Sequence, residues 1–195
     1  GSVISLPNNS MKSVVPNYKI EGLTVQNLIK NGNFRDEENH WIRVSHPKED
    51  VIRIDGKLIA KGTNLKTGGY YQDVPSNKKD KLYIAFNYTY NSGRDIDVTI
   101  RDFGGFDNTI TMQLNETSGI KSLIVSEKEK GIRIYFRVLD QSFYDSEIEN
   151  VQIYNLTQTF GAGNEPSKEW CDKYLPDYVE GTKSVQLPMR VKSVG

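Results

Sequence analysis

Strict alternation of apolar and polar residues recurs along this chain and is the feature that most limits its fold. In the segments 81–90 and 95–101 every second residue is apolar, and the segments 109–114 and 132–138 repeat the pattern. A period of two places one side of each strand in a core and the other in solvent, which is typical of antiparallel sheets. We therefore predict an all-β chain built from antiparallel strands.

Turn-forming residues separate the apolar runs into short strands. Within 51–60, Asp55 and Gly56 stand between two such runs, and this pair tolerates the positive φ of a tight hairpin turn. Roughly ten short strands divided by turns are typical of a β-sandwich or a barrel. Strands do not alternate with long helical patterns, so a doubly wound nucleotide-binding fold is not expected. Further strands are predicted at 23–29, 41–44, 69–74, 120–126 and 148–156.

One segment near the C-terminal end departs from the alternation and predicts a short helix. Asn164 and Ser167 are both candidate N-caps, and Pro176 supplies a stop. Trp170 and Tyr174 share one side of this helix because they are four residues apart. We expect that aromatic side to pin the helix to the sandwich.

Composition removes several classes of function. The chain has 25 Lys and Arg residues against 25 Asp and Glu residues, so its net charge is zero. A protein that neutralises many phosphates carries a basic excess, so no nucleic-acid partner is expected. No apolar run is long enough to cross a bilayer, so membrane insertion is not expected. Cys171 is the single cysteine, which excludes an intrachain disulfide, and we interpret it as a small packing residue rather than a nucleophile.

The two margins of the chain resemble each other. Residues 16–26 and 176–186 both read Pro-x-Tyr, then Glu-Gly, then Val-Gln, with a shift of one residue. Self-similar margins are typical of junctions between modules in a tandem array, and chance similarity of a short segment is the alternative. The junction interpretation makes residues 1–22 an N-terminal linker and residues 179–195 a C-terminal junction, in a slice of a longer protein.

The most specific short motif begins at Asn27. It reads Asn-Leu-Ile-Lys-Asn-Gly-Asn-Phe and is followed by His40-Trp41. This motif resembles the opening of the jelly-roll carbohydrate-binding modules that accompany glycoside hydrolases, and residues 146–156 resemble their last strand. In this loop Asn31-Gly32 makes the corner, so that an aromatic residue can enter the core from each side.

The resemblance implies a fold and raises the question of a metal. It implies an antiparallel jelly-roll β-sandwich over residues 23–158, and residues 159–178 then form a short C-terminal helical extension. The family often places an acidic residue of a structural calcium site directly after the Phe of the motif, where this chain has Arg35. A structural calcium therefore stays open, and no other cofactor is expected.

A second resemblance covers residues 153–178. The strand ending Tyr-Asn-Leu runs into Phe-Gly-Ala-Gly-Asn-Glu-Pro and then into a segment bearing Cys171. The segment is similar to one in tail and baseplate proteins of phages that infect Gram-positive bacteria. Together the two resemblances imply a carbohydrate-binding module of the virion that recognises host cell-surface polysaccharide and contacts neighbouring modules and other tail proteins. The alternatives are a structural spacer or assembly module of such a tail protein, and an ancillary module of a secreted glycosidase.

Sugar binding by a sandwich requires aromatic rings that stack on pyranose faces and planar polar groups that hold hydroxyls. If the apolar residues of 95–101 and 132–138 point inward, their charged and aromatic neighbours form such a surface. Tyr135 is the first choice, because an exposed tyrosine between two arginines has little structural reason. The alternative is a solvated sheet face with cross-strand Asp–Arg pairs. The candidate ligand-binding residues are Tyr71, Tyr83, Asp97, Arg101, Phe103, Arg133, Tyr135 and Arg137.

Catalysis receives little support from the sequence. Asp95 and Asp97 would lie about 6.5–7 Å apart on one side of a strand, a spacing that glycosidases allow. Alternating Asp on an exposed strand is commonplace, however, and His40 and His46 have no companion pattern of a catalytic site. We therefore expect no enzyme activity, and the sequence assigns no metal ligand.

Overall fold

The computed structural model describes residues 18–45, 51–126, 128–175 and 177–190. By their contacts these residues divide into two compact units, one from Asn27 to Gly181 and the other made of the two margins of the chain. Each unit is described by itself.

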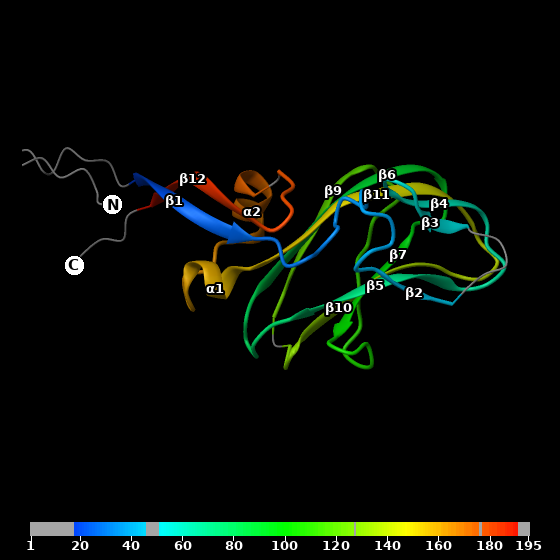
Figure 1. Cartoon of the computed structure of the whole chain (residues 1–195), viewed down its shortest axis with the longest axis horizontal. Helices are drawn as coiled ribbons and strands as arrows, with labels where there is room; N and C mark the ends of the chain where they lie inside the picture. The colour runs from blue at the N-terminus through cyan, green and yellow to red at the C-terminus, as the bar shows by residue number, and fades with distance from the viewer. Residues whose placement is uncertain (1–17, 46–50, 127, 176, 191–195) are drawn as a thin grey trace, which may run out of the picture. The chain divides into compact units, whose positions relative to one another are not determined.

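Two antiparallel five-stranded sheets form the unit from Asn27 to Gly181, and Figure 1 shows them as two layers. The first, called the β10 sheet, has the order β2 (Ile42–Val44), β5 (Gly68–Pro75), β10 (Gly131–Val138), β7 (Asp97–Asp102), β8 (Ile110–Thr111). The second, called the β11 sheet, has the order β3 (Ile52–Ile54), β4 (Leu58–Thr63), β11 (Phe143–Asn155), β6 (Leu82–Gly93), β9 (Gly119–Val125).

The connections identify the sandwich as a jelly roll. The chain crosses from one sheet to the other between β4 and β5, between β5 and β6, and again between β6 and β7. All the strand pairings of the two sheets are antiparallel. The predicted all-β jelly-roll class is therefore confirmed, and so is the Asp55-Gly56 hairpin, because Ile54 pairs with Leu58 across it.

The core lies between the sheets and is filled by the alternating apolar residues. Phe34 and Trp41 of the opening motif are both buried, and their ring centroids lie 5.1 Å apart. Trp41 also meets Phe136 of β10 edge-on at 5.8 Å, so the opening loop packs into the same core as the central strand. The predicted entry of these aromatics into the core is confirmed.

The strand predicted at 23–29 differs from the structure, because the backbone leaves the extended ladder at Asn27. The Asn27 side-chain oxygen accepts hydrogen bonds from the N–H groups of Ile29 and Ile153, both at 3.0 Å. The side-chain amide of Asn27 donates to the carbonyls of Val151 and Val179. Asn27 therefore starts the sandwich unit with side-chain hydrogen bonds in place of strand pairing.

The margins of the chain pair with each other as a two-stranded ribbon. β1 (Tyr18–Gln26) runs antiparallel to β12 (Thr182–Arg190), from Tyr18 opposite Arg190 to Gln26 opposite Thr182. The sandwich unit begins at residue 27 and ends at residue 181, so its limits differ from the predicted 23 and 158, and it includes the predicted helical extension. The role of the margins as module junctions stays a prediction.

Two short helices follow β11. These are α1 (Leu156–Phe160) and α2 (Lys168–Tyr174), and Ser167 caps α2 by accepting the Trp170 N–H at 3.1 Å. Of the two predicted N-cap candidates, Ser167 is therefore the one that caps α2. The predicted stop at residue 176 lies outside the described residues. No helix in the described part of the chain has the length and apolar character that crossing a membrane requires.

The side of α2 that is buried differs from the prediction. Cys171 and Leu175 are buried, whereas Trp170 and Tyr174 are partly exposed and stack on each other at 4.9 Å. The helix turns its small thiol and its leucine inward because these also lie four residues apart and fit closer to the sheet than two large rings do. The complete burial of Cys171 agrees with its interpretation as a packing residue, and this burial raises the pKa of the thiol to about 12.

Candidate functional site

The outward surface of the β10 sheet gathers most of the predicted site residues. Alternation along β5, β7 and β10 turns their charged and aromatic side chains away from the core. We call this surface the Arg–Tyr face. It comprises Tyr71, Asp73, Asp97, Thr99, Arg101, Arg133, Tyr135 and Arg137.

Strand register places these side chains in rows across the sheet. Tyr135 lies opposite Tyr71 on one neighbouring strand and opposite Thr99 on the other. Arg137 lies opposite Asp97, and Arg133 lies opposite Asp73. Because directly opposite residues have neighbouring Cβ atoms, the charged pairs form without any long reach.

Arg133 is held by the most complete set of contacts on the face. Its Nε and Nη2 donate to the two carboxylate oxygens of Asp73, both at 2.8 Å, which is a bidentate pair. Its guanidinium carbon lies 3.7 Å from the ring centroid of Tyr71, so the planar group stacks on that ring. The hydrogen bonds that Arg133 donates to Asp73 raise the pKa of Arg133, so its charge is permanent.

Arg137 and Asp97 form the second ion pair of the face. Nη2 and Nε of Arg137 donate to one carboxylate oxygen of Asp97 at 2.8 and 3.1 Å. Both side chains remain partly exposed, at 21% for Arg137 and 15% for Asp97. The pair therefore still presents donors and acceptors to solvent.

Tyr135 faces outward as predicted but is not exposed, since only 8% of it reaches solvent. The guanidinium carbons of Arg101, Arg137 and Arg133 lie 5.0, 5.5 and 5.7 Å from its ring centroid. Tyr71 lies beside it with a centroid distance of 5.3 Å. The expectation of an exposed Tyr135 is therefore wrong, because the long side chains of Arg133 and Arg137 on the same strand and of Arg101 on neighbouring β7 fold over the ring.

The loop between β7 and β8 reaches back over the same end of the face. Gly105 has a φ of +87°, and a Cβ at this position would lie 2.7 Å from both Tyr135 Oη and Arg133 Nη1. Only glycine fits this approach without displacing those side chains. Phe103 and Phe106 of the loop are exposed, Phe106 at 87%, so the predicted residue Phe103 borders the face on this loop.

Tyr83 is the predicted site residue that the structure places elsewhere. It lies on β6 of the other sheet, where it is 1% exposed, and its hydroxyl donates to Asp172 of α2 at 2.6 Å. Ser122 donates to the same carboxylate oxygen at 2.6 Å. Tyr83 therefore anchors the helical extension and is not part of the candidate site.

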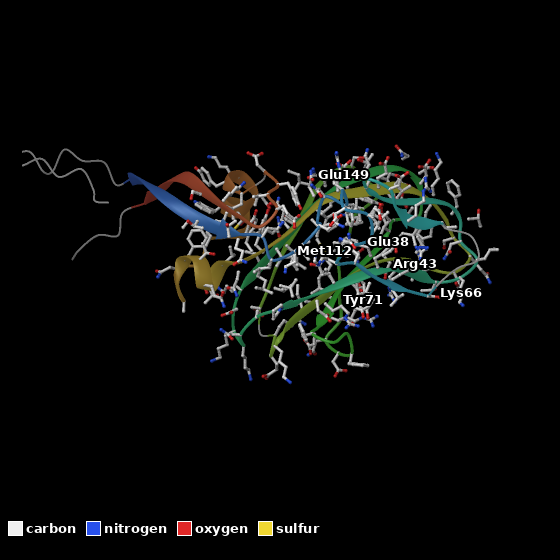
Figure 2. The ribbon with its side chains drawn as sticks, viewed as in Figure 1. Glu38, Arg43, Lys66, Tyr71, Met112 and Glu149 are labelled. Atoms are coloured by element: carbon white, nitrogen blue, oxygen red, sulfur yellow. The ribbon has the colours of Figure 1, made fainter. Side chains whose placement is uncertain are left out.

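A charged cluster borders Tyr71 at the β2 edge of the sheet. Tyr70 is buried, as expected for the inward member of the Tyr70-Tyr71 pair, and its hydroxyl donates to Glu38 at 2.7 Å. Arg43 pairs with Glu38 at 3.4 Å and also donates to the Tyr70 hydroxyl (Figure 2). Burial, followed by the hydrogen bond to Glu38, raises the pKa of Tyr70 to about 12. The cluster therefore consists of the Arg43–Glu38 ion pair and a neutral phenol that contacts both partners.

A pocket of about 310 Å³ adjoins the Arg–Tyr face at its Asp97 end, and sequence reasoning missed it. It is lined by residues 94–97 and 111–114 together with Glu116, and we call it the β7–β8 pocket. The alternation of 95–101 indicated that Asp95 and Asp97 share a side, but nothing in the sequence indicates that the turn at Glu116 lies near them. The N–H of Glu116 donates to Asp95 at 3.0 Å and fixes that turn.

In the opening loop, the side chain of Asn31 occupies the region where the resemblance implies a possible calcium site. The Asn31 side-chain amide donates to the carbonyls of Asp36, Glu37 and Asn39 at 3.3, 3.0 and 2.9 Å. A cation would have to displace an amide that already satisfies these oxygens. Within the described residues, no group of three His, Cys, Asp or Glu is placed to hold a metal. The Asn31 amide thus takes up these oxygens in the described residues, and calcium stays a prediction of the resemblance alone.

Comparison with known proteins bears on the fold. No protein-family model and no curated protein matches the chain. Among solved structures, the enzymatically active domain of tailspike protein 4 from bacteriophage CBA120 matches with a TM-score of 0.50 and 14% identity, over 65% of this chain and 21% of that one. TmCBM61 in complex with β-1,4-galactotriose matches with a TM-score of 0.47 and 17% identity, over 66% of this chain and 98% of that one.

A third match is the CBM22-1 xylan-binding domain of Paenibacillus barcinonensis Xyn10C, with a TM-score of 0.41 and 12% identity, over 69% of this chain and 94% of that one. The chain spans about a fifth of the tailspike domain, at 21% of its length. At such identities the likeness concerns the fold alone.

Proposed function

We propose that this chain is a non-catalytic carbohydrate-binding module of a phage tail or baseplate protein, and that it binds a polysaccharide on the surface of a Gram-positive host. The observation that carries the proposal is the Arg–Tyr face, which combines tyrosine rings, guanidinium groups and carboxylates on adjacent strands of one sheet. Planar polar groups beside aromatic rings are the chemistry by which proteins hold sugars. The resemblance of 153–178 to phage tail proteins and the tailspike fold likeness support the setting in a virion, beside other tail modules.

The contacts on the face give the proposal a mechanism. Tyr71 is partly exposed, and Ile42 opposite it on β2 is 51% exposed, so the two side chains form an apolar strip that suits the C–H side of a pyranose. Arg133, Arg137, Asp73 and Asp97 stand along the strip with donors and acceptors for hydroxyls. Because their ion pairs already fix these groups, binding costs little side-chain entropy.

The proposal includes no catalytic role for the carboxylates of the pocket. Asp97 accepts both hydrogen bonds from Arg137, and Asp95 accepts from the Tyr88 hydroxyl at 2.9 Å and from the Glu116 N–H. A glycosidase requires one carboxylic acid that donates a proton to the glycosidic oxygen. Both carboxyls are instead used as acceptors within the protein.

Calorimetric titration with cell-wall polysaccharide purified from the host tests the proposal. Tyr71→Ala removes the partly exposed ring of the face, and we expect about a five- to tenfold loss of affinity. Phe143→Ala is the matched control, because it removes an exposed ring from the other sheet, and it should leave affinity unchanged. A folded wild-type chain that binds no polysaccharide would refute the proposal, as would equal effects of the two substitutions.

One observation favours a second candidate, a structural spacer that binds no glycan. The charged groups of the face pair within the protein, and Tyr135 is almost fully covered. A face built only to stabilise the sheet would look similar. The spacer predicts that Tyr71→Ala changes the free energy of unfolding while no polysaccharide of the host binds the wild type.

A further inference from the structure

We infer that the β7–β8 pocket is a subsite for one amine-bearing sugar unit, so that the module selects glycans with protonated amino sugars over anionic ones. The inference rests on the proposed function and names a ligand class that the Arg–Tyr face alone does not. It is carried by the position of the pocket, by the nature of its walls and by the balance of charges around it.

The pocket has the size and the walls of a small-ligand site. Its volume of about 310 Å³ falls at the lower end of the range of such sites, about 300–1,000 Å³. Ile96 and Leu114 of its lining are buried, and Met112 of the same lining is partly exposed. Thr111 and Gln113 add polar side chains from β8 and the residues after it. Apolar walls with a few polar groups suit a single sugar ring.

Asp97 joins the pocket to the Arg–Tyr face. It lines the pocket and is the ion-pair partner of Arg137 on the face. Thr99, two residues along β7, is buried with a hydroxyl that has no hydrogen-bond partner among the described residues, and it lies opposite Thr111 of the pocket. The terminal sugar of a glycan bound along the Arg–Tyr face would therefore reach the β7–β8 pocket.

Carboxylates dominate the charge of the pocket. The charge of Asp97 is balanced by Arg137. Arg94 also lines the pocket and donates to the neutral Ser142 hydroxyl at 3.3 Å, so its single positive charge stands against the two carboxylates of Asp95 and Glu116. Asp95 accepts hydrogen bonds only from neutral donors, and neither Asp95 nor Glu116 has an ion-pair partner within the described ranges. The pocket therefore keeps an excess of negative charge, which would repel an incoming phosphate or uronate and attract an ammonium group.

Neighbouring Tyr90 responds to the same negative charges. Burial raises the pKa of its phenol, and the charges of Glu116 and Asp95 raise it further. A cation placed between these carboxylates would relieve that field. A metal ion is a poorer occupant than an ammonium group, since no set of three acidic, histidine or cysteine ligands converges in the described part of the chain.

The experiment compares two ligands that share one backbone and differ at the nitrogen, which is a charged ammonium in one and a neutral acetamide in the other. The full chain is titrated with the β-1,4-linked trimer of glucosamine and with its N-acetylated counterpart, at a mildly acidic pH that protonates the free amines. We expect the glucosamine trimer to bind about tenfold more tightly and its advantage to shrink as salt is added. Glu116→Gln should reduce the advantage about fivefold, whereas Glu169→Gln, the same change at an exposed site on α2, should not.

The possible results separate this inference from the proposed function. Equal binding of the two trimers, tighter binding of the acetylated trimer, or equal effects of the two glutamate variants would overturn the inference. Binding of neither trimer, together with host polysaccharide binding that Tyr71→Ala weakens, would overturn the inference and leave the proposed function standing. Loss of polysaccharide binding as well would overturn both. Thermal melts of each variant confirm that it is folded.

Discussion

Replacing Arg137 with glutamine distinguishes a binding face from a merely structural one. The substitution removes a guanidinium that makes hydrogen bonds of 2.8 and 3.1 Å to Asp97, and it leaves that carboxylate without its cation. Exposed ion pairs are worth about 0–1 kcal/mol and buried hydrogen bonds to charged groups about 1.5–3 kcal/mol. Since the pair is only partly exposed, we expect a loss near 1 kcal/mol in the free energy of unfolding, or about 2–4 °C in Tm for a domain of this size.

The effect of Arg137→Gln on affinity should be larger than its effect on stability. A guanidinium that donates to sugar hydroxyls and also positions Asp97 is worth about 1.5–3 kcal/mol, or roughly ten- to a hundredfold in Kd. Calorimetric titration with host polysaccharide measures Kd, and urea unfolding measures stability on the same samples. Lys57→Gln is the matched control, because Lys57 pairs at 3.1 Å with both Glu147 and Glu149 on the other sheet. If the Arg137→Gln variant is less stable but binds polysaccharide with the affinity of the wild type, the reasoning is refuted and the spacer interpretation is favoured.

Further predictions concern the loop, the helix and the metal. Gly105→Ala should lower the free energy of unfolding by about 1–2 kcal/mol, because its φ of +87° disfavours a side chain, and chemical denaturation measures this. Burial opposes ionisation of Asp172, yet hydrogen bonds from Ser122 and Tyr83 lower its pKa below 3.8. Its stabilisation is therefore complete above the ordinary carboxyl pKa and is lost as the pH falls through the lower folded value. Asp172→Asn should accordingly destabilise the chain at neutral pH and less at about pH 3, and equal destabilisation at both would contradict this. Removal of calcium with a chelator should leave Tm unchanged, and a clear fall in Tm would show that a cation supports the fold.

The sandwich was predictable because burial on one side of a strand leaves a period of two in the sequence. That period correctly placed Arg133, Tyr135 and Arg137 on one outward surface with Asp97. It could not place Tyr83, because the outward side of β6 is partly covered by α2, and such covering leaves no mark within the strand itself. The predicted exposure of Tyr135 was wrong because its ring is covered by Arg101 of β7, by Gly105 of the following loop and by the two arginines of its own strand. The sequence shows Arg133 and Arg137 beside Tyr135, but it does not show that their side chains fold over the ring.

The pocket and the buried side of α2 depend on contacts between distant segments. Glu116 approaches Asp95 only because a turn after β8 is fixed by a backbone N–H, and neither residue marks this in the sequence. On α2, two pairs with the same spacing were available, Trp170 with Tyr174 and Cys171 with Leu175. The choice between them depends on how closely the helix approaches β6 and β9, which hydropathy alone does not specify.

The most direct test of the account is the position at which a glycan contacts the chain. The isotope-labelled full chain is titrated with oligosaccharide fragments released from the host cell wall, and backbone amide shifts are followed by NMR. The account predicts that shifts concentrate on β5, β7 and β10, around Tyr71 and Arg137, and extend to residues 111–116. Shifts centred on the outward side of the β11 sheet, or no shifts at a saturating concentration of fragments, would contradict it.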